Sequence, residues 1–157
     1  MSRLAPEEIE RLAAQLPLRG ALHTDLIELE AAQQFAAAIG AVLHSNSAGR
    51  LVAPTTILTR LMITDRPPWY EDLLRGTMFH AGERYLMHQE IVVGSELEWT
   101  GTLEAITSKT GRSGHLWFVQ SHYEFREAGS RAAVADAWRT RVVVTDQDRP
   151  AYSLYSV

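Results

Sequence analysis

The sequence contains no cysteine, no excess of basic residues and no long apolar run. Without cysteine the chain has no disulfide, no thiolate nucleophile and no cysteine-ligated zinc, a composition that fits a reducing compartment. Lysine and arginine number 15 against 19 aspartate and glutamate residues, so no basic surface is offered to a phosphate backbone. No apolar run approaches the length of a membrane span. These absences predict a cytoplasmic protein that binds neither nucleic acid nor membranes.

The histidines of the chain predict no metal site. They stand at positions 23, 44, 80, 88, 115 and 122. No two of them have the HxxxH spacing that would place two metal ligands on one face of a helix. We therefore expect no bound metal.

The composition is that of one ordinary domain. The chain has 157 residues, of which 46% are hydrophobic and 22% charged, which is enough for a single globular domain with a core of its own. No internal repeat and no low-complexity linker divides it. We predict one domain over residues 1–157, with a helical extension at 1–20 and a C-terminal tail at 146–157.

Apolar residues recur at helical spacing in two early segments. Residues 6–16 carry one apolar stripe, which Pro17 and Gly20 are expected to stop. Residues 31–39 carry a second stripe, which ends at Gly40, a residue type that commonly follows a helix. Both patterns predict amphipathic helices that lie on a core.

Two further elements are expected before the middle of the chain. A short extended piece is expected at residues 26–29, and Pro54 opens a third, short helix that ends at a break over residues 65–68. The apolar side chains of this helix all face one way: Ile57, Leu58, Leu61 and Met62. This pattern predicts that the helix is buried.

Beyond Gly82 the pattern changes to strands and turns. Long stretches rich in β-branched and aromatic residues, separated by turns that contain glycine, run over 84–93, 96–107, 115–126 and 131–145. In the third stretch one face is expected to be dry, with Trp117, Val119, Ser121, Tyr123 and Phe125, and the other wetter, with Gln120, His122, Glu124 and Arg126. The economical architecture is α+β, with an antiparallel sheet wrapped around one buried helix.

Several segments together resemble the MaoC-like hydratases and dehydratases. The similarity is carried by FAAAIG (35–40), LVAPTTILTRL (51–61), FHAGERYLMHQEIVVGSEL (79–97), TSKTGRSGHLWFV (107–119) and VADAWRTRVVV (134–144). The chain is most similar to the N-terminal dehydratase branch, which includes the heterodimeric 3-hydroxyacyl-carrier-protein dehydratases of actinobacteria. The resemblance implies a hot-dog fold and an acyl chain on a pantetheine arm as the ligand, with no further cofactor.

The family motif, close to GDxNPxH, falls in the loop after Gly40. Addition of water across a 2,3-enoyl thioester needs a general acid and base, and the motif Asp and His imply those roles. Here Ala41 stands where the resemblance expects the Asp, no Asn-Pro pair follows, and His44 stands four rather than six residues after Gly40. His44 is the one catalytic candidate of the loop, and we predict a degenerate loop in which His44 has no catalytic role.

Five residues are candidates for substrate binding. Pro54, Thr55 and Thr56 begin the central helix, whose amides can face a thioester oxygen, although both threonines could instead cap the helix. The resemblance places His80 and Gly82 near the mouth of the acyl tunnel, although His80 could instead cap a turn. The aromatic residues Tyr85, Trp99, Trp117, Tyr123 and Trp138 are expected in the core or in a dimer interface instead.

Three functions from different classes remain open. The first is a non-catalytic subunit that binds or stabilises substrate in a hydratase or dehydratase. It would form a homodimer or pair with a catalytic MaoC-like chain. A variant of this hypothesis is an active His-dependent hydratase or dehydratase. The second is a hot-dog thioesterase, which needs a carboxylate on or near the central helix, where only Asp65 follows at the end. The third is a protein that only binds a thioester, a small ligand or an acyl carrier protein.

Overall fold

A computed structural model of the chain describes residues 3–111 and 114–145. Its elements in chain order are α1 (Pro6–Ala13), β1 (Leu18–Leu26), α2 (Leu29–Ala38), β2 (His44–Ser45), β3 (Leu51–Ala53), α3 (Ile57–Met62), α4 (Pro68–Leu73), β4 (Thr77–Met87), β5 (Ile91–Val92), β6 (Glu96–Gly111), β7 (Gly114–Glu127) and β8 (Ala133–Val144). Long antiparallel strands and a few short helices confirm the predicted α+β class.

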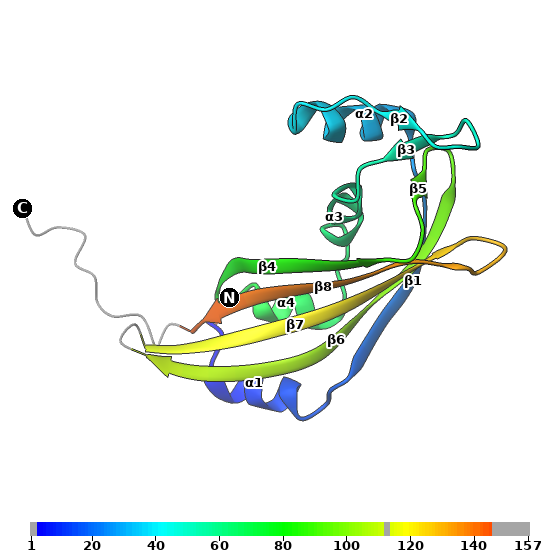
Figure 1. Ribbon diagram of the computed structural model, residues 1–157. Coiled ribbons are helices and arrows are strands. Elements are labelled where there is room, and N and C mark those ends of the chain that lie inside the picture. Colours follow the sequence, from blue (N-terminus) through cyan, green and yellow to red (C-terminus); the bar gives the residue numbers. More distant parts are fainter. Residues whose placement is uncertain (1–2, 112–113, 146–157) are drawn as a thin grey trace, which may run out of the picture.

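Five strands form one antiparallel sheet in the order β1-β6-β7-β8-β4. The strands β6, β7 and β8 pair in chain order, as the predicted meander requires. The strands β1 and β4 come from earlier in the chain and form the two edges of the sheet. A second, small sheet of β2, β3 and β5 lies with α2 at one end of the molecule, away from α1 and α4 (Figure 1).

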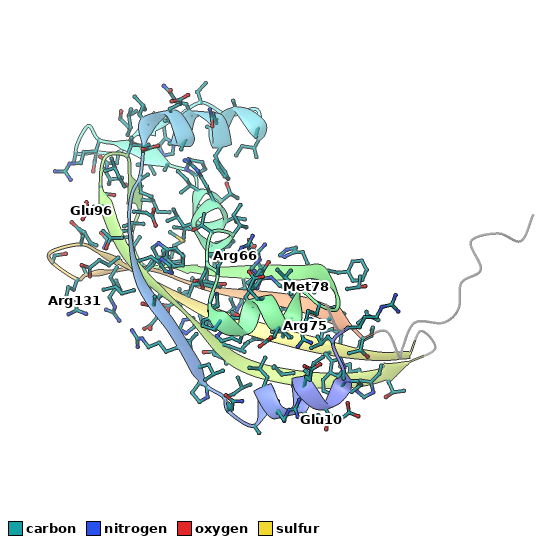
Figure 2. All side chains as sticks on the ribbon, turned by 180° about the vertical axis from the view of Figure 1, so that it is seen from behind. Glu10, Arg66, Arg75, Met78, Glu96 and Arg131 are labelled. Carbon is teal, nitrogen blue, oxygen red and sulfur yellow. The ribbon has the colours of Figure 1, made fainter. Side chains whose placement is uncertain are left out.

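Side chains along β7 sort by face as the sequence predicted. Those expected on the dry face are all buried: Trp117, Val119, Ser121, Tyr123 and Phe125. The residues that alternate with them are half-buried or exposed. Figure 2, seen from behind, shows α4 lying along one face of the sheet, and the buried residues of α4, Trp69 and Leu73, pack against the same dry face. This face is called the inner face below.

Two hydrophobic clusters fill the inner face. The first surrounds α3, whose apolar residues Ile57, Leu58, Leu61 and Met62 are buried as predicted, and it includes Trp99 and Tyr123 from the sheet. The second joins α1 and α4 to the sheet and includes Trp117. Complete burial of one leucine such as Leu58 contributes about 2 kcal/mol, so these contacts fix α3 firmly. Tyr85 and Trp138 are only half-buried.

The first strand differs from the expectation. The sequence predicted an extended piece at 26–29 and a helical extension over 1–20, but α1 ends at Ala13 and β1 runs over Leu18–Leu26. Gly20 therefore lies inside a strand. A Cβ at Gly20 would stand 3.0 Å from the backbone oxygen of Gly101 on β6, so a close approach of two strands, rather than a helix stop, explains this glycine.

Three other boundaries also differ. The break expected at residues 65–68 both ends α3 and begins α4, because Pro68 occupies a first helical position, where its missing N–H leaves no bond unmade. The strand expected at 84–93 is two strands, β4 and β5. The short strands β2 and β3 were not predicted, since two or three residues carry no readable period. The predicted tail at 146–157 lies outside the described residues.

Candidate functional site

The start of α3 presents exposed polar groups. Pro54 is half-buried, whereas Thr55 and Thr56 are exposed. The Pro54 carbonyl accepts the Ile57 N–H at 3.0 Å, which closes the first turn. Thr56 occupies the capping position without a capping bond from its side chain, so the capping role considered for it is wrong. Within the described residues the amides of Thr55 and Thr56 donate no hydrogen bond, which leaves them available at this end of the helix.

The loop after α2 is held by an asparagine. Gly40 has a φ of 70°, which ends α2 in the left-handed region. The Oδ1 atom of Asn46 accepts the N–H groups of Ala48 and Arg50, each at 3.0 Å, and its Nδ2 donates to Glu90 at 3.1 Å. Asparagine side chains commonly stabilise turns in this way, by accepting backbone N–H groups that follow them in the chain.

His44 stands alone in this loop. It is exposed on β2, opposite Val52 on β3. Its side chain makes no hydrogen bond or ion pair within the described part of the chain. A catalytic imidazole is normally oriented by a second group, and none is present here.

An apolar hollow lies beside the loop. It has a volume of about 390 Å³ and is lined by Gln33, Ala36, Ala37, Ala41, Val42, Leu43 and Leu51. Small alanine side chains on α2 create the space. The hollow offers room for an apolar group next to His44, whose strand begins directly after Leu43.

His80 and Gly82 do not lie at a turn. Both belong to the edge strand β4, at a bulge where the pairing with β8 shifts by one residue. His80 lies opposite Arg141 and is exposed. His80 lies three positions before Glu83 and five before Tyr85, the two β4 residues that bond Thr59 of α3, which corresponds to roughly 10 Å and 16 Å along a strand. No hydrogen bond joins His80 to α3 within the described residues.

A carboxylate reaches the middle of α3 from the sheet. Thr59 donates to Oε2 of Glu83 at 2.9 Å, and the Tyr85 hydroxyl donates to the same oxygen at 2.5 Å. Arg139 lies 3.2 Å from the other oxygen of Glu83, and both side chains are largely buried. Burial and the Glu83 carboxylate raise the pKa of Tyr85 to about 12, so this hydroxyl keeps its proton.

A second carboxylate lies at the end of α3. Asp65 is 5% exposed, and its Oδ1 atom lies 3.0 Å from Nε2 of His23 on β1. The other oxygen, Oδ2, is buried and has no hydrogen-bond partner among the described residues. No local motif in the sequence predicts this pair, because the two residues are 42 positions apart.

Further histidines gather on the outer face of the sheet. His88 and His122 each contact Asp136, at 2.6 Å and 2.7 Å, and His122 also lies 3.3 Å from Glu104. Burial alone would raise the pKa of Asp136, but the hydrogen bonds from the two histidines outweigh this effect and lower it. The neighbours of Asp136 along β8 point inward, so this group faces away from α3.

Within residues 3–111 and 114–145, no group of three or more histidine, aspartate and glutamate side chains is arranged to hold a metal ion. In the same described ranges, no helix has both the length and the apolar character needed to cross a membrane.

Comparison with known proteins gives structural matches only. No protein-family model and no curated protein matches the sequence. The ChsH1-ChsH2 complex from Mycobacterium tuberculosis contains a chain with a TM-score of 0.67 at 18% identity, over 96% of this chain and 94% of that one. The HadBC (3R-hydroxyacyl-ACP dehydratase) complex from the same organism gives 0.62 at 18% identity, over 81% and 94%. The chain has the hot-dog fold.

A third neighbour of this hot-dog chain has a MaoC-like name. The MaoC-like dehydratase from Rhodospirillum rubrum gives a TM-score of 0.53 at 21% identity, over 85% of this chain and 92% of that one. The predicted fold, a sheet wrapped around a central helix, is therefore confirmed. The central helix of the hot-dog fold corresponds to α3, so the polar groups at its start, middle and end are the candidate site.

Proposed function

We propose that this chain is a MaoC-like acyl-thioester protein and a non-catalytic subunit of a hydratase or dehydratase that interconverts 3-hydroxyacyl and 2-enoyl thioesters. One observation carries the proposal: α3 is intact, with Thr55 and Thr56 exposed at its start, while His44 is exposed on β2 and pairs with no carboxylate among the described residues. The scaffold for binding is therefore kept, whereas the acid and base that the reaction needs are missing from the loop.

The ligand fits the start of α3. Free amides at the positive end of a helix can donate to a thioester oxygen, and the hollow beside the loop can take an apolar acyl group. The pantetheine arm would belong either to coenzyme A or to an acyl carrier protein. The lack of cysteine fits a reducing compartment, and we place the subunit in the cytoplasm.

The partner in this proposal is a second hot-dog chain that pairs along β4. This edge strand has 11 residues, and Phe79 and Leu86 on it are 56% and 51% exposed. An exposed apolar edge can add another strand, because an edge strand offers backbone N–H and C=O groups for strand pairing on its open side. The partner would bring the catalytic Asp and His. The solved HadBC and ChsH1-ChsH2 neighbours are complexes, which supports a hetero-dimer over a homodimer.

The test is hydration of a short and a medium 2-enoyl-CoA, followed by loss of enoyl absorbance. We expect no hydration by this chain alone. Mixing it with a MaoC-like chain that has an intact GDxNPxH loop should produce hydration above that of the partner alone. Size-exclusion chromatography of the mixture should show a complex of the two chains.

The remaining outcomes would overturn the proposal. Hydration by this chain alone would mean that it carries its own acid and base for this reaction. No gain on mixing, together with no thioester binding by calorimetry, would remove the chain from acyl-thioester chemistry. Thioester binding without any gain on mixing would favour a protein that only binds the ligand.

A further inference from the structure

The Asp65 and His23 pair is not used by the proposed function. Asp65 is buried at the end of the central helix, whereas the His23 side chain on the edge strand β1 remains 31% exposed. A buried carboxylate bonded to a partly exposed imidazole is the arrangement that orients a general base in many hydrolases. Here β1 and the end of α3 assemble it, far from the loop in which the family motif falls.

The imidazole of His23 is held on two sides. It stacks on Trp99 with the ring centroids 4.2 Å apart and the planes 20° apart. Trp99 is itself fixed by a 2.8 Å hydrogen bond from its Nε1 to Asp25, two residues along β1. Since Nε2 of His23 faces the Asp65 carboxylate, the proton of the neutral ring belongs on Nε2. The lone pair is then on Nδ1, which has no hydrogen-bond partner in the described residues.

Asp65 forms its side-chain hydrogen bond with His23. Its Oδ1 atom bonds His23, and its Oδ2 atom is buried with no hydrogen-bond partner among residues 3–111 and 114–145. This position exists because Gly101 has no side chain: a Cβ there would lie 2.7 Å from Oδ2 of Asp65. A buried carboxylate that bonds one ring nitrogen fixes the orientation of the imidazole, so Asp65 acts as a positioning residue for His23.

The surroundings of Asp65 suit a thioester of coenzyme A. The residues next to it, Ile63, Thr64 and Arg66, are exposed. Arg66, labelled in Figure 2 near the end of α3, carries a guanidinium that packs 4.6 Å from the centre of the Tyr70 ring. A guanidinium attracts phosphate groups, and Ile63 offers an apolar surface to an acyl group. Both ligand chemistries are present in an acyl-CoA.

We propose that His23 is a general base, positioned by Asp65, and that it gives this chain a thioester hydrolase activity of its own, beyond the proposed function. Nδ1 of His23 takes a proton from water as the water oxygen bonds to the thioester carbonyl carbon. The carbon–sulfur bond then breaks, and His23 returns the proton to the leaving sulfur. Acyl thioester and water thus become a carboxylic acid and a thiol. Asp65 is the carboxylate near the central helix that a hot-dog thioesterase needs.

The test measures free thiol released from acetyl-CoA and a medium-chain acyl-CoA by the full chain alone. His23→Gln is the informative variant, because its amide can still donate to Asp65 and so preserve a structural role. We expect it to lose about a hundredfold of the activity, the size of a general base contribution. His44→Gln makes the same change at an exposed, unpaired histidine and should leave the rate unchanged. Asp65→Asn should lower the rate about tenfold or more and alter its pH dependence.

Three results would overturn the inference. They are no thiol release above background by the wild type, equal rates for wild type and His23→Gln, or a pH profile that His23→Gln leaves unchanged. Circular dichroism and urea denaturation of each variant check that the chain is folded. Thiol release is measured without a partner, whereas the proposed function is measured as enoyl hydration on mixing, so either can fail while the other holds.

Discussion

The two ends of the central helix differ in what surrounds their polar groups. At its start, Thr55 and Thr56 are exposed, and the His44 side chain on β2 makes no hydrogen bond or ion pair in the part of the chain that the structure describes. At its end, Asp65 is buried and bonded to a stacked, partly exposed His23. In the described residues, the start of the helix has donors but no histidine held by a carboxylate, whereas its end has such a histidine. Position in a fold therefore does not decide where chemistry can occur, because an acid–base pair needs a buried partner and a fixed ring.

A hydrogen-bond network lies at the middle of α3, between the two ends. Thr59, Glu83 and Tyr85 share hydrogen bonds there, and Arg139 pairs with Glu83. Every polar atom of Glu83 has a partner, and Tyr85 keeps its proton up to high pH. This network ties α3 to the edge strand β4 and is better suited to stabilising the helix than to activating water.

The largest effect is expected from Gly101→Ala, which crowds Asp65 at the end of α3. The added Cβ would meet Oδ2 of Asp65 and a ring carbon of Tyr123, each at 2.7 Å. Overpacking of this kind lowers the free energy of unfolding by about 1–3 kcal/mol, to be measured by urea denaturation. Because Asp65 must move, thiol release should fall as well, while thioester binding at the start of α3 should persist.

Gly82→Ala is the matched control for Gly101→Ala. A Cβ at Gly82 meets no atom within 4 Å, so the free energy of unfolding should change by less than about 0.5 kcal/mol. If Gly101→Ala were as well tolerated and kept its thiol release, Asp65 would not be held in a fixed position. The end of α3 would then hold its acid–base pair no more firmly than the start of α3 holds its exposed groups.

A smaller effect is expected from Tyr85→Phe, which leaves both ends intact. Loss of its hydroxyl should lower the free energy of unfolding by about 1 kcal/mol at neutral pH, without changing thiol release or thioester binding. Since the folded pKa of Tyr85 is raised to about 12, its contribution is present below the ordinary value of 10 and is lost as the pH rises from 10 towards 12.

Urea denaturation at neutral pH and near pH 11 measures the contribution of Tyr85 to the free energy of unfolding. The stability difference between wild type and Tyr85→Phe should shrink as the pH rises, because the unfolded wild type releases a proton that the folded chain retains. Tyr70→Phe is the control, since the Tyr70 ring packs against Arg66 and Arg141 while its hydroxyl makes no hydrogen bond within the described residues. An alkaline loss of equal size in both variants would remove Tyr85 as its source.

The smallest effect is expected from His44→Ala, at the loop. Its side chain is exposed and unpaired, so the free energy of unfolding should stay within about 0.5 kcal/mol of the wild type. Enoyl hydration by the mixed pair of chains should also stay the same. Loss of hydration in this variant would restore a catalytic role to His44 and reverse the comparison of the two ends.

Local patterns in the sequence predicted much of the fold. The apolar stripe at residues 31–39 predicted the helix that the structure shows as α2. The alternation of apolar and polar residues along β7 predicted which of its side chains are buried. The pattern failed at β1, where Gly20 was taken for a helix stop. A glycine needed for close approach to another strand cannot be told from a glycine that ends a helix unless the other strand is known.

The sequence by itself determined the α+β class and the buried central helix, because each depends on residues close together in the chain. Only the tertiary structure decided which carboxylates reach that helix. Glu83 comes 24 residues after Thr59, and Asp65 comes 42 residues after His23. The order and register of the strands create both contacts, and these depend on long-range pairing that no local period encodes.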